Sequence, residues 1–205
     1  MSQLIQLKQG VAAIIADEWT LVKLPESQTE ERKQAGKVVL FKLTGEQSVT
    51  DAQIAGTVIP ETGKVIVPLR VFLARREALK TRMDKGELGI WFATHEPIED
   101  LINAVPDINA LPIIAIFVER FPDGRIFTLG SWLRTRYGFK NTLRAFGDVL
   151  RDQLFFQKRC GFDQFEIRAG RSAQDAIVSL NDFDTPYQGA VDAAPAFKRF
   201  SRGAA

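Results

Sequence analysis

The fold is decided by residues 88–118, which read LGIWFATHEPIEDLINAVPDINALPIIAIFV. Two continuous apolar runs in this stretch, residues 88–93 and 113–118, have the length of buried β-strands. Between them, Pro97 followed by Glu99 and Asp100 marks the first turn of a helix, where the helix dipole favours acidic side chains. A strand, a helix and a second strand in this order predict a βα unit of a parallel sheet.

The same alternation continues towards the carboxyl terminus. Strands are predicted at residues 142–147 and 164–168, and helices at residues 127–137, 149–160 and 172–180. The repeat of about 25 residues indicates a core of about four βα units over residues 88–180. The predicted fold class is therefore α/β with a parallel sheet. The periodicity fits both half of a (β/α) barrel and an open sheet.

The amino-terminal part, residues 1–69, is predicted to be rich in β-structure. Strands are expected at residues 3–8, 12–23, 38–43 and 65–69, and the first two form a hairpin around Gly10. A polar loop is expected at residues 25–37 and a basic helix at residues 71–85. Residues 181–205 are rich in Pro, Gly and Ala and are expected to form an extended tail. At 205 residues, the whole chain is expected to be one domain.

Composition and charge exclude several classes of protein. A hydrophobic share of 45% and a charged share of 25% exclude a disordered chain. The chain has 27 basic and 25 acidic residues, which argues against a nucleic-acid-binding protein. No run of residues resembles a signal peptide or a membrane span, so we expect a cytoplasmic protein without a membrane partner. Residues 125–171 hold ten basic and four acidic side chains, which suits either a solvated face or an acidic or anionic partner.

Sequence motifs for cofactors are missing. No G-x-G-x-x-G follows a predicted strand, and neither a P-loop nor a G-x-S-x-G motif occurs, so we expect no cofactor. The single cysteine, Cys160, and the single histidine, His95, do not make a zinc site, and no metal is expected. His95 follows a predicted strand, which suits either a catalytic group or an ordinary helix start. Cys160 ends a predicted helix before Gly161, where a structural thiol is expected.

Polar residues interrupt the predicted core. Strand alternation places Arg144 and Asp148 on one face of their strand, and Glu166 and Arg168 on one face of the next. These four charges form either one buried network, since buried charges must pair, or the solvated face of an edge strand.

The predicted helices show the same interruption. On the helix at residues 149–160, Gln153 and Gln157 fall on the apolar face, with Phe156, and Phe155 falls on the charged side. Such amides either bond each other and the backbone or line a polar cavity. On the helix before, Arg136 lies among apolar side chains, which suits either a functional group or an arginine that reaches out to solvent.

The second half of the chain resembles a bacterial family. The segments FPDGRIFTLGSWLRTRYGF (121–139) and LRAFGDVLRDQLFFQKRCGFDQFEI (143–167) are similar to the domain of unknown function 934, whose members carry D-G-R, L-R-A-x-G-D-V-L-x-D-Q-L and R-C-G-F-D-x-F-E. Such proteins are described as probable oxidoreductases of sulfite reduction, because their genes lie beside those of sulfite reductase. The resemblance transfers no catalytic residue. Ile126, Phe127, Thr128 and Gln157 depart from the family pattern, and His95 matches none of it.

Three hypotheses follow from these observations. The first is an accessory protein of assimilatory sulfate and sulfite reduction that interacts with sulfite reductase or another sulfur-pathway reductase. The second is an enzyme acting on a small oxyanion. In it Arg125, Arg136, Arg144 and Gln153 bind the substrate, and Asp148 and Glu166 serve as acid and base. The third is an oxidoreductase with a borrowed flavin or nicotinamide, which the family description alone implies.

Overall fold

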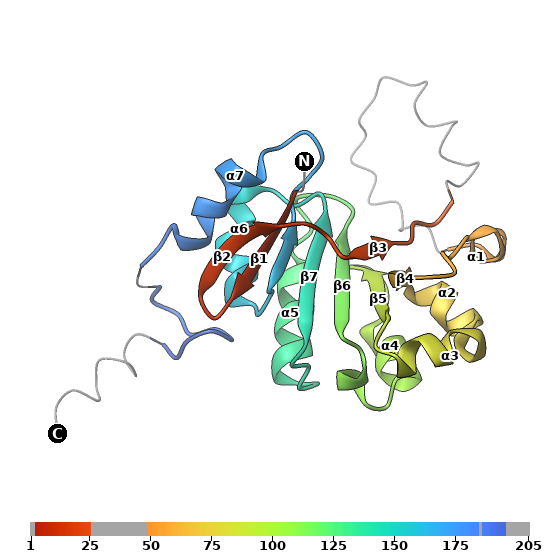
Figure 1. Ribbon diagram of the computed structural model, residues 1–205. Helices are drawn as coiled ribbons and strands as arrows, with labels where there is room; N and C mark the ends of the chain where they lie inside the picture. The colour runs from red at the N-terminus through yellow and green to blue at the C-terminus, as the bar shows by residue number, and fades with distance from the viewer. Residues whose placement is uncertain (1–2, 26–48, 185, 196–205) are drawn as a thin grey trace, which may run out of the picture.

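A computed structural model describes residues 3–25, 49–184 and 186–195 (Figure 1). It is a mixed α/β structure around an eight-stranded sheet of order β2-β1-β8-β7-β6-β5-β4-β3, curled into a half-barrel. Of the two predicted α/β architectures, the chain therefore adopts the half-barrel. The predicted strand at residues 38–43, and all but Pro25 of the predicted loop at residues 25–37, lie outside the described residues.

Six neighbouring strands of the sheet are parallel, and an antiparallel hairpin completes it. The parallel strands are β3 (Trp19–Leu21), β4 (Lys64–Pro68), β5 (Leu88–Ala93), β6 (Ile113–Val118), β7 (Thr142–Gly147) and β8 (Gln164–Glu166). The hairpin of β1 (Leu4–Lys8) and β2 (Val11–Ile15) is antiparallel to β8 through β1. The predicted βα core is confirmed, and β5, β6 and β7 have the predicted bounds.

Most of the helices pack against the outer face of the curled sheet, and the first helix lies beside the second. They are α1 (Asp51–Gly56), α2 (Leu69–Ala74), α3 (Arg76–Asp84), α4 (Ile98–Ala104), α5 (Arg125–Thr135), α6 (Arg151–Arg159) and α7 (Ala173–Ala176), with short 3₁₀ turns η1 (Ile108–Ala110) and η2 (Ile177–Asn181). The main core forms where alternate strand residues, such as Ile90 and Ile116, meet helix residues such as Leu101 and Leu129. Among the described residues, no helix is long and apolar enough to cross a membrane.

The predicted strand at residues 12–23 is wrong, because the structure divides it between the two edges of the sheet. β2 ends at Ile15 and β3 begins at Trp19, beside β4 at the opposite edge. The link at residues 16–18 can span at most about 14 Å, whereas a flat sheet of eight strands is about 34 Å wide. The short link therefore requires the curl of the sheet, and it crosses in front of β7 and β6 (Figure 1).

The inner face of the sheet carries a second, smaller core. Ile66, Trp91 and Phe146 from the strands pack there against Trp19 and Leu21. The Trp91 Nε1–H group donates a hydrogen bond to the carbonyl of Val22, 2.8 Å away. This contact ties the chain just after β3 to the inner face of β5.

The predicted helix at residues 71–85 is interrupted. It breaks at Arg75, whose backbone leaves the helical region at φ −121° and ψ 26°. The Arg75 guanidinium instead donates to the carbonyls of Ile54, Ala55 and Thr57, at and just beyond the carboxyl end of α1. Helix α1 was not predicted, although a capping box between Thr50 and Gln53 begins it.

The tail folds back over α6, and this exchanges the predicted exposures of Phe155 and Phe156. The ring of Phe183 lies 5.0 Å from that of Phe155, and the Val191 N–H group donates to the carbonyl of Arg159. Phe155 is consequently 6% exposed, whereas Phe156 is 50% exposed. The prediction that Phe155 is the exposed ring is wrong, because a segment distant in sequence covers it.

Candidate functional site at the carboxyl edge of the sheet

Arg144 lies on the inner face of β7 and is completely buried. Its Nε–H group donates to Gln164 Oε1 at 2.9 Å, and its two Nη groups donate to the Asp17 carboxylate at 2.7 and 2.8 Å. Glu166 lies two residues beyond Gln164 on β8. Burial raises the pKa of Glu166, and the charge of Asp17 adds to this, while Arg144 and Lys23 oppose it. The side chain of Glu166 thus combines a raised pKa with a place near the charge of a fixed arginine.

Asp148 lies at the carboxyl edge, directly after β7. Its Oδ2 accepts a hydrogen bond from the Phe121 N–H group at 3.0 Å, and its Oδ1 lies 3.1 Å from Nη1 of Arg168. Gln153 Nε2 donates to the carbonyl of Phe121 at 2.7 Å. Asp148 and Gln153 therefore hold the loop after β6 through the N–H and the carbonyl group of Phe121.

The loops after β5 and β6 meet through Thr94 and Asp123. The Thr94 hydroxyl donates to Asp123 Oδ2, and Arg125 donates to the same carboxylate from Nε at 2.9 Å and Nη2 at 2.7 Å. Burial alone would raise the pKa of Asp123, but the hydrogen bonds of Arg125 and Thr94 lower it to about 2. Asp123 is therefore charged at neutral pH.

His95 follows Thr94 and lies partly buried at the same edge. Its Nδ1 is buried and has no hydrogen-bond partner among the described residues. The next residue, Glu96, accepts a hydrogen bond from the Ala93 N–H group and pairs with Arg70, which follows β4. At the carboxyl edge, polar contacts thus link the loops after β4, β5, β6, β7 and β8, each to the next.

The structure brings some of the predicted site residues together and separates others. Arg144 lies opposite Gln164 on the neighbouring strand, two residues before Glu166, and its charge acts on the Glu166 carboxyl. Asp148 pairs with Arg168, but no hydrogen bond or ion pair joins these two pairs among the described residues. Arg125 begins α5, and Arg136 lies at its opposite end, about 16 Å away for eleven residues. The arginines proposed to share one substrate do not converge.

The two core amides of α6 bond each other and the backbone, one of the two predicted alternatives. Gln157 Nε2 lies 3.5 Å from Gln153 Oε1, and Gln153 reaches the Phe121 carbonyl. Cys160 is half-buried at the end of α6, and burial raises the pKa of its thiol. Within the described residues, no group of three or more His, Cys, Asp or Glu side chains could hold a metal ion.

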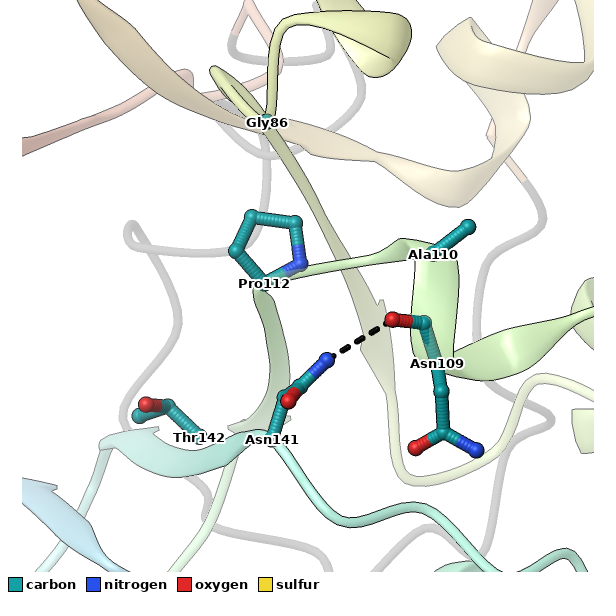
Figure 2. A pocket seen from close by; sticks show the side chains of 6 residues that line it. All are labelled: Gly86, Asn109, Ala110, Pro112, Asn141 and Thr142. Atoms are coloured by element: carbon teal, nitrogen blue, oxygen red, sulfur yellow. Dashed lines mark hydrogen bonds between the residues drawn. The ribbon is translucent and has the colours of Figure 1, made fainter.

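Two cavities lie at opposite edges of the sheet. A cavity of about 270 Å³ lies at the amino edge, where Asn141 Nδ2 donates to the carbonyls of Asn109 and Leu111, both at 2.8 Å (Figure 2). These bonds tie together the chain segments that enter β6 and β7. A cavity of about 370 Å³ lies at the carboxyl edge, between the start of α6 and residues 167–176.

A comparison with protein families assigns the second half of the chain. A family model described as bacterial protein of unknown function (DUF934) matches residues 89–197. The chain belongs to the DUF934 family. No curated protein and no solved structure matches it significantly.

Part of the DUF934 motif pattern is explained by a clamp around Arg134 at the amino edge. Its guanidinium donates to the Asp163 carboxylate and to the carbonyls of Gly161, Phe139 and Asn141. Gly161 has φ +95°, and a Cβ there would lie 2.5 Å from Arg134 Cγ. These DUF934 motif residues hold α5, α6 and β8 together.

The DUF934 motif residues at the carboxyl edge form the candidate site. They are Asp123, Arg125, Asp148 and Gln153, all in the contacts described above. Sequence reasoning singled out the last three as site residues and missed Thr94 and Asp123. The available signal was their position, because both lie in loops that directly follow buried parallel strands, where ligands bind in such folds.

Proposed function

We propose that the protein is an accessory protein of assimilatory sulfate and sulfite reduction, which docks on sulfite reductase or another reductase of that pathway. The pathway is proposed from the family resemblance. Docking is proposed from one surface at the carboxyl-terminal end of α5. We call this surface the α5 docking face, and it consists of Trp132, Arg136, Tyr137 and Lys140.

The observation that supports docking is the stacking of Arg136. Its guanidinium carbon lies 5.4 Å from the ring centres of both Trp132 and Tyr137. Trp132 is 39% exposed and Arg136 is exposed. Tryptophan, tyrosine and arginine are the residues that most often carry the binding energy of protein interfaces. Stacking also holds the arginine in place, which lowers the entropic cost of binding.

The charge of this face selects an acidic partner. Residues 124–147 contain five basic residues and no Asp or Glu. Three of these, Arg125, Arg134 and Arg144, pair with Asp123, Asp163 and Asp17. Arg136 and Lys140 have no acidic partner among the described residues, so their charge is available to a docking protein.

Growth of a deletion strain tests the pathway. We expect sulfide or cysteine to restore growth, whereas sulfate or sulfite as the sole sulfur source does not. This pattern corresponds to a defect at the sulfite-reduction step. Normal growth on all four sources, in a strain without a second gene of this family, would contradict the proposal.

Binding to purified sulfite reductase tests the docking face. We expect an association at 25 mM salt that weakens at 200 mM, because added salt screens exposed charges. Trp132→Ala and Arg136→Glu should each weaken it at least tenfold, whereas Arg76→Glu, an exposed arginine on α3, should not. Equal losses in Arg136→Glu and Arg76→Glu would show that general charge, and not this face, attracts the reductase.

A second candidate function is an enzyme acting on a small oxyanion, which the raised pKa of Glu166, on the strand next to the buried Arg144, favours. Complementation of the deletion strain separates it from docking. Folded Glu166→Gln and Asp148→Asn proteins should restore growth if the protein only docks. Failure of these two variants, together with rescue by Trp132→Ala, would favour the enzyme.

A further inference from the structure

The cavity of about 370 Å³ at the carboxyl edge has the size of a small-molecule site. Its apolar side is formed by Leu150, Ile167 and Ala176, of which the last two are 2% exposed. The cavity lies after β7 and β8, at the edge where parallel sheets bind ligands. It is thus a concave surface with an apolar wall.

Two arginines, Arg151 and Arg171, line this cavity. Both are exposed, and neither side chain makes a hydrogen bond or ion pair within the described part of the chain. Five other arginines of residues 125–168 do have an acidic partner: Arg125 with Asp123, Arg134 with Asp163, Arg144 with Asp17, Arg159 with Asp192 and Arg168 with Asp148. A sixth, Arg136, stacks on two aromatic rings. The positive charges at the cavity are left available.

The position of Arg151 is unfavourable for the fold itself. It is the first residue of the nine-residue helix α6, where the helix dipole disfavours a cation. Two acids, Asp152 and Asp175, also line the cavity, but they lie in the first turns of α6 and α7, where negative charge is favoured. The helix dipoles therefore favour the two acids at their positions. No contact among the described residues favours Arg151 at its position, whereas a bound anion would.

We propose that this cavity binds an organic anion through a phosphate or sulfonate group held between Arg151 and Arg171. Arginine presents paired N–H groups that match the oxygens of such a group. The organic part lies against Leu150, Ile167 and Ala176. The proposal does not depend on the α5 docking face, which consists of other residues.

Calorimetry and thermal unfolding of the full chain test this proposal. The probes are ribose 5-phosphate and ethanesulfonate as organic anions, sodium phosphate and sulfate as inorganic ions, and ribose and putrescine as uncharged and cationic controls. We expect the organic anions to bind and to raise the unfolding temperature. Arg151→Gln and Arg171→Gln should each lower their affinity at least tenfold, whereas Arg76→Gln should not change it.

Each other outcome decides against part or all of the proposal. Inorganic phosphate binding as tightly as ribose 5-phosphate, with loss in both arginine variants, would support the anion group and overturn the organic part. Stabilisation that persists in both variants would be a general salt effect and would overturn the site. Binding of putrescine alone, or of no probe at 10 mM, would overturn it as well.

Discussion

Asp17 and Arg144 are 127 positions apart in the sequence, and they form a two-pronged ion pair on the inner face of the curled sheet. Asp17 lies in the link between β2 and β3, and Arg144 lies on the central strand β7. Arg144 is fully buried, so this carboxylate is the acidic partner on which its charge depends.

Asp17→Asn should therefore destabilise the protein strongly. We expect a loss of about 3 kcal/mol in the free energy of unfolding, the lower end for a broken buried pair, because Asp17 keeps 30% exposure. Its neighbour Glu18 pairs with Lys64 at the surface, and Glu18→Gln should cost less than about 1 kcal/mol. Urea unfolding at pH 7 measures both, and equal effects would contradict the importance of the pair.

Glu166→Gln should stabilise the protein at neutral pH. Burial raises the pKa of Glu166, so the folded state holds this proton more tightly than the unfolded chain does. The stability from the protonated form is complete below the ordinary glutamate pKa of 4.5 and is lost as pH rises through the folded value. The urea midpoint of Glu166→Gln should thus be higher than that of the unsubstituted protein at pH 7, and the two midpoints should be equal below pH 4.5. A constant difference at all pH values would contradict this.

Gly161→Ala should cost more stability than Gly170→Ala. Both glycines have positive φ, +95° and +82°, so both substitutions strain the backbone. Only at Gly161 would the new Cβ meet a side chain, Arg134, whereas nothing lies within 4 Å at Gly170. We expect an additional loss of about 1–3 kcal/mol at Gly161 from this overpacking. Equal thermal stabilities would show that the Arg134 clamp moves aside freely.

Phe155→Ala and Phe156→Ala distinguish the two sides of α6. Phe155 is buried beneath the tail, and its truncation should cost about 3 kcal/mol. Phe156 is half-exposed and should cost less than about 1 kcal/mol. Denaturant unfolding compares them, and the reverse order would mean that the tail does not cover α6 in solution.

Local pattern was sufficient to predict the central strands. β5 and β6 are continuous apolar runs because they are buried on both faces. β7 begins directly after Asn141 and ends at Gly147, whose φ is positive. No local pattern predicts the link at residues 16–18, because the link is held by the ion pair between Asp17 and the distant Arg144. The exposure of Phe155 likewise depends on Phe183, which lies beyond the next helix.

Part of the candidate site was likewise predictable from local pattern, and part was not. Asp148 and Gln153 were predicted from their strand end and helix face, and both lie at the carboxyl edge. The arginines were each predicted from a motif, a helix face or a strand face, and none of these patterns shows that α5 carries Arg125 and Arg136 to opposite edges of the sheet. Thr94 and Asp123 were missed because their hydrogen bond joins two loops 29 residues apart.

The pairing of Leu4 with Glu166 sets the order in which the chain assembles. During synthesis β1 leaves the ribosome first, but one of its two neighbouring strands is the last strand of the sheet to be made. The amino-terminal hairpin therefore joins the sheet only after the βα core is complete. Contacts over such sequence distances slow folding. A nascent chain ending before β8 would hold its first strand unpaired on one side, and an unpaired strand edge of this kind can pair with other chains.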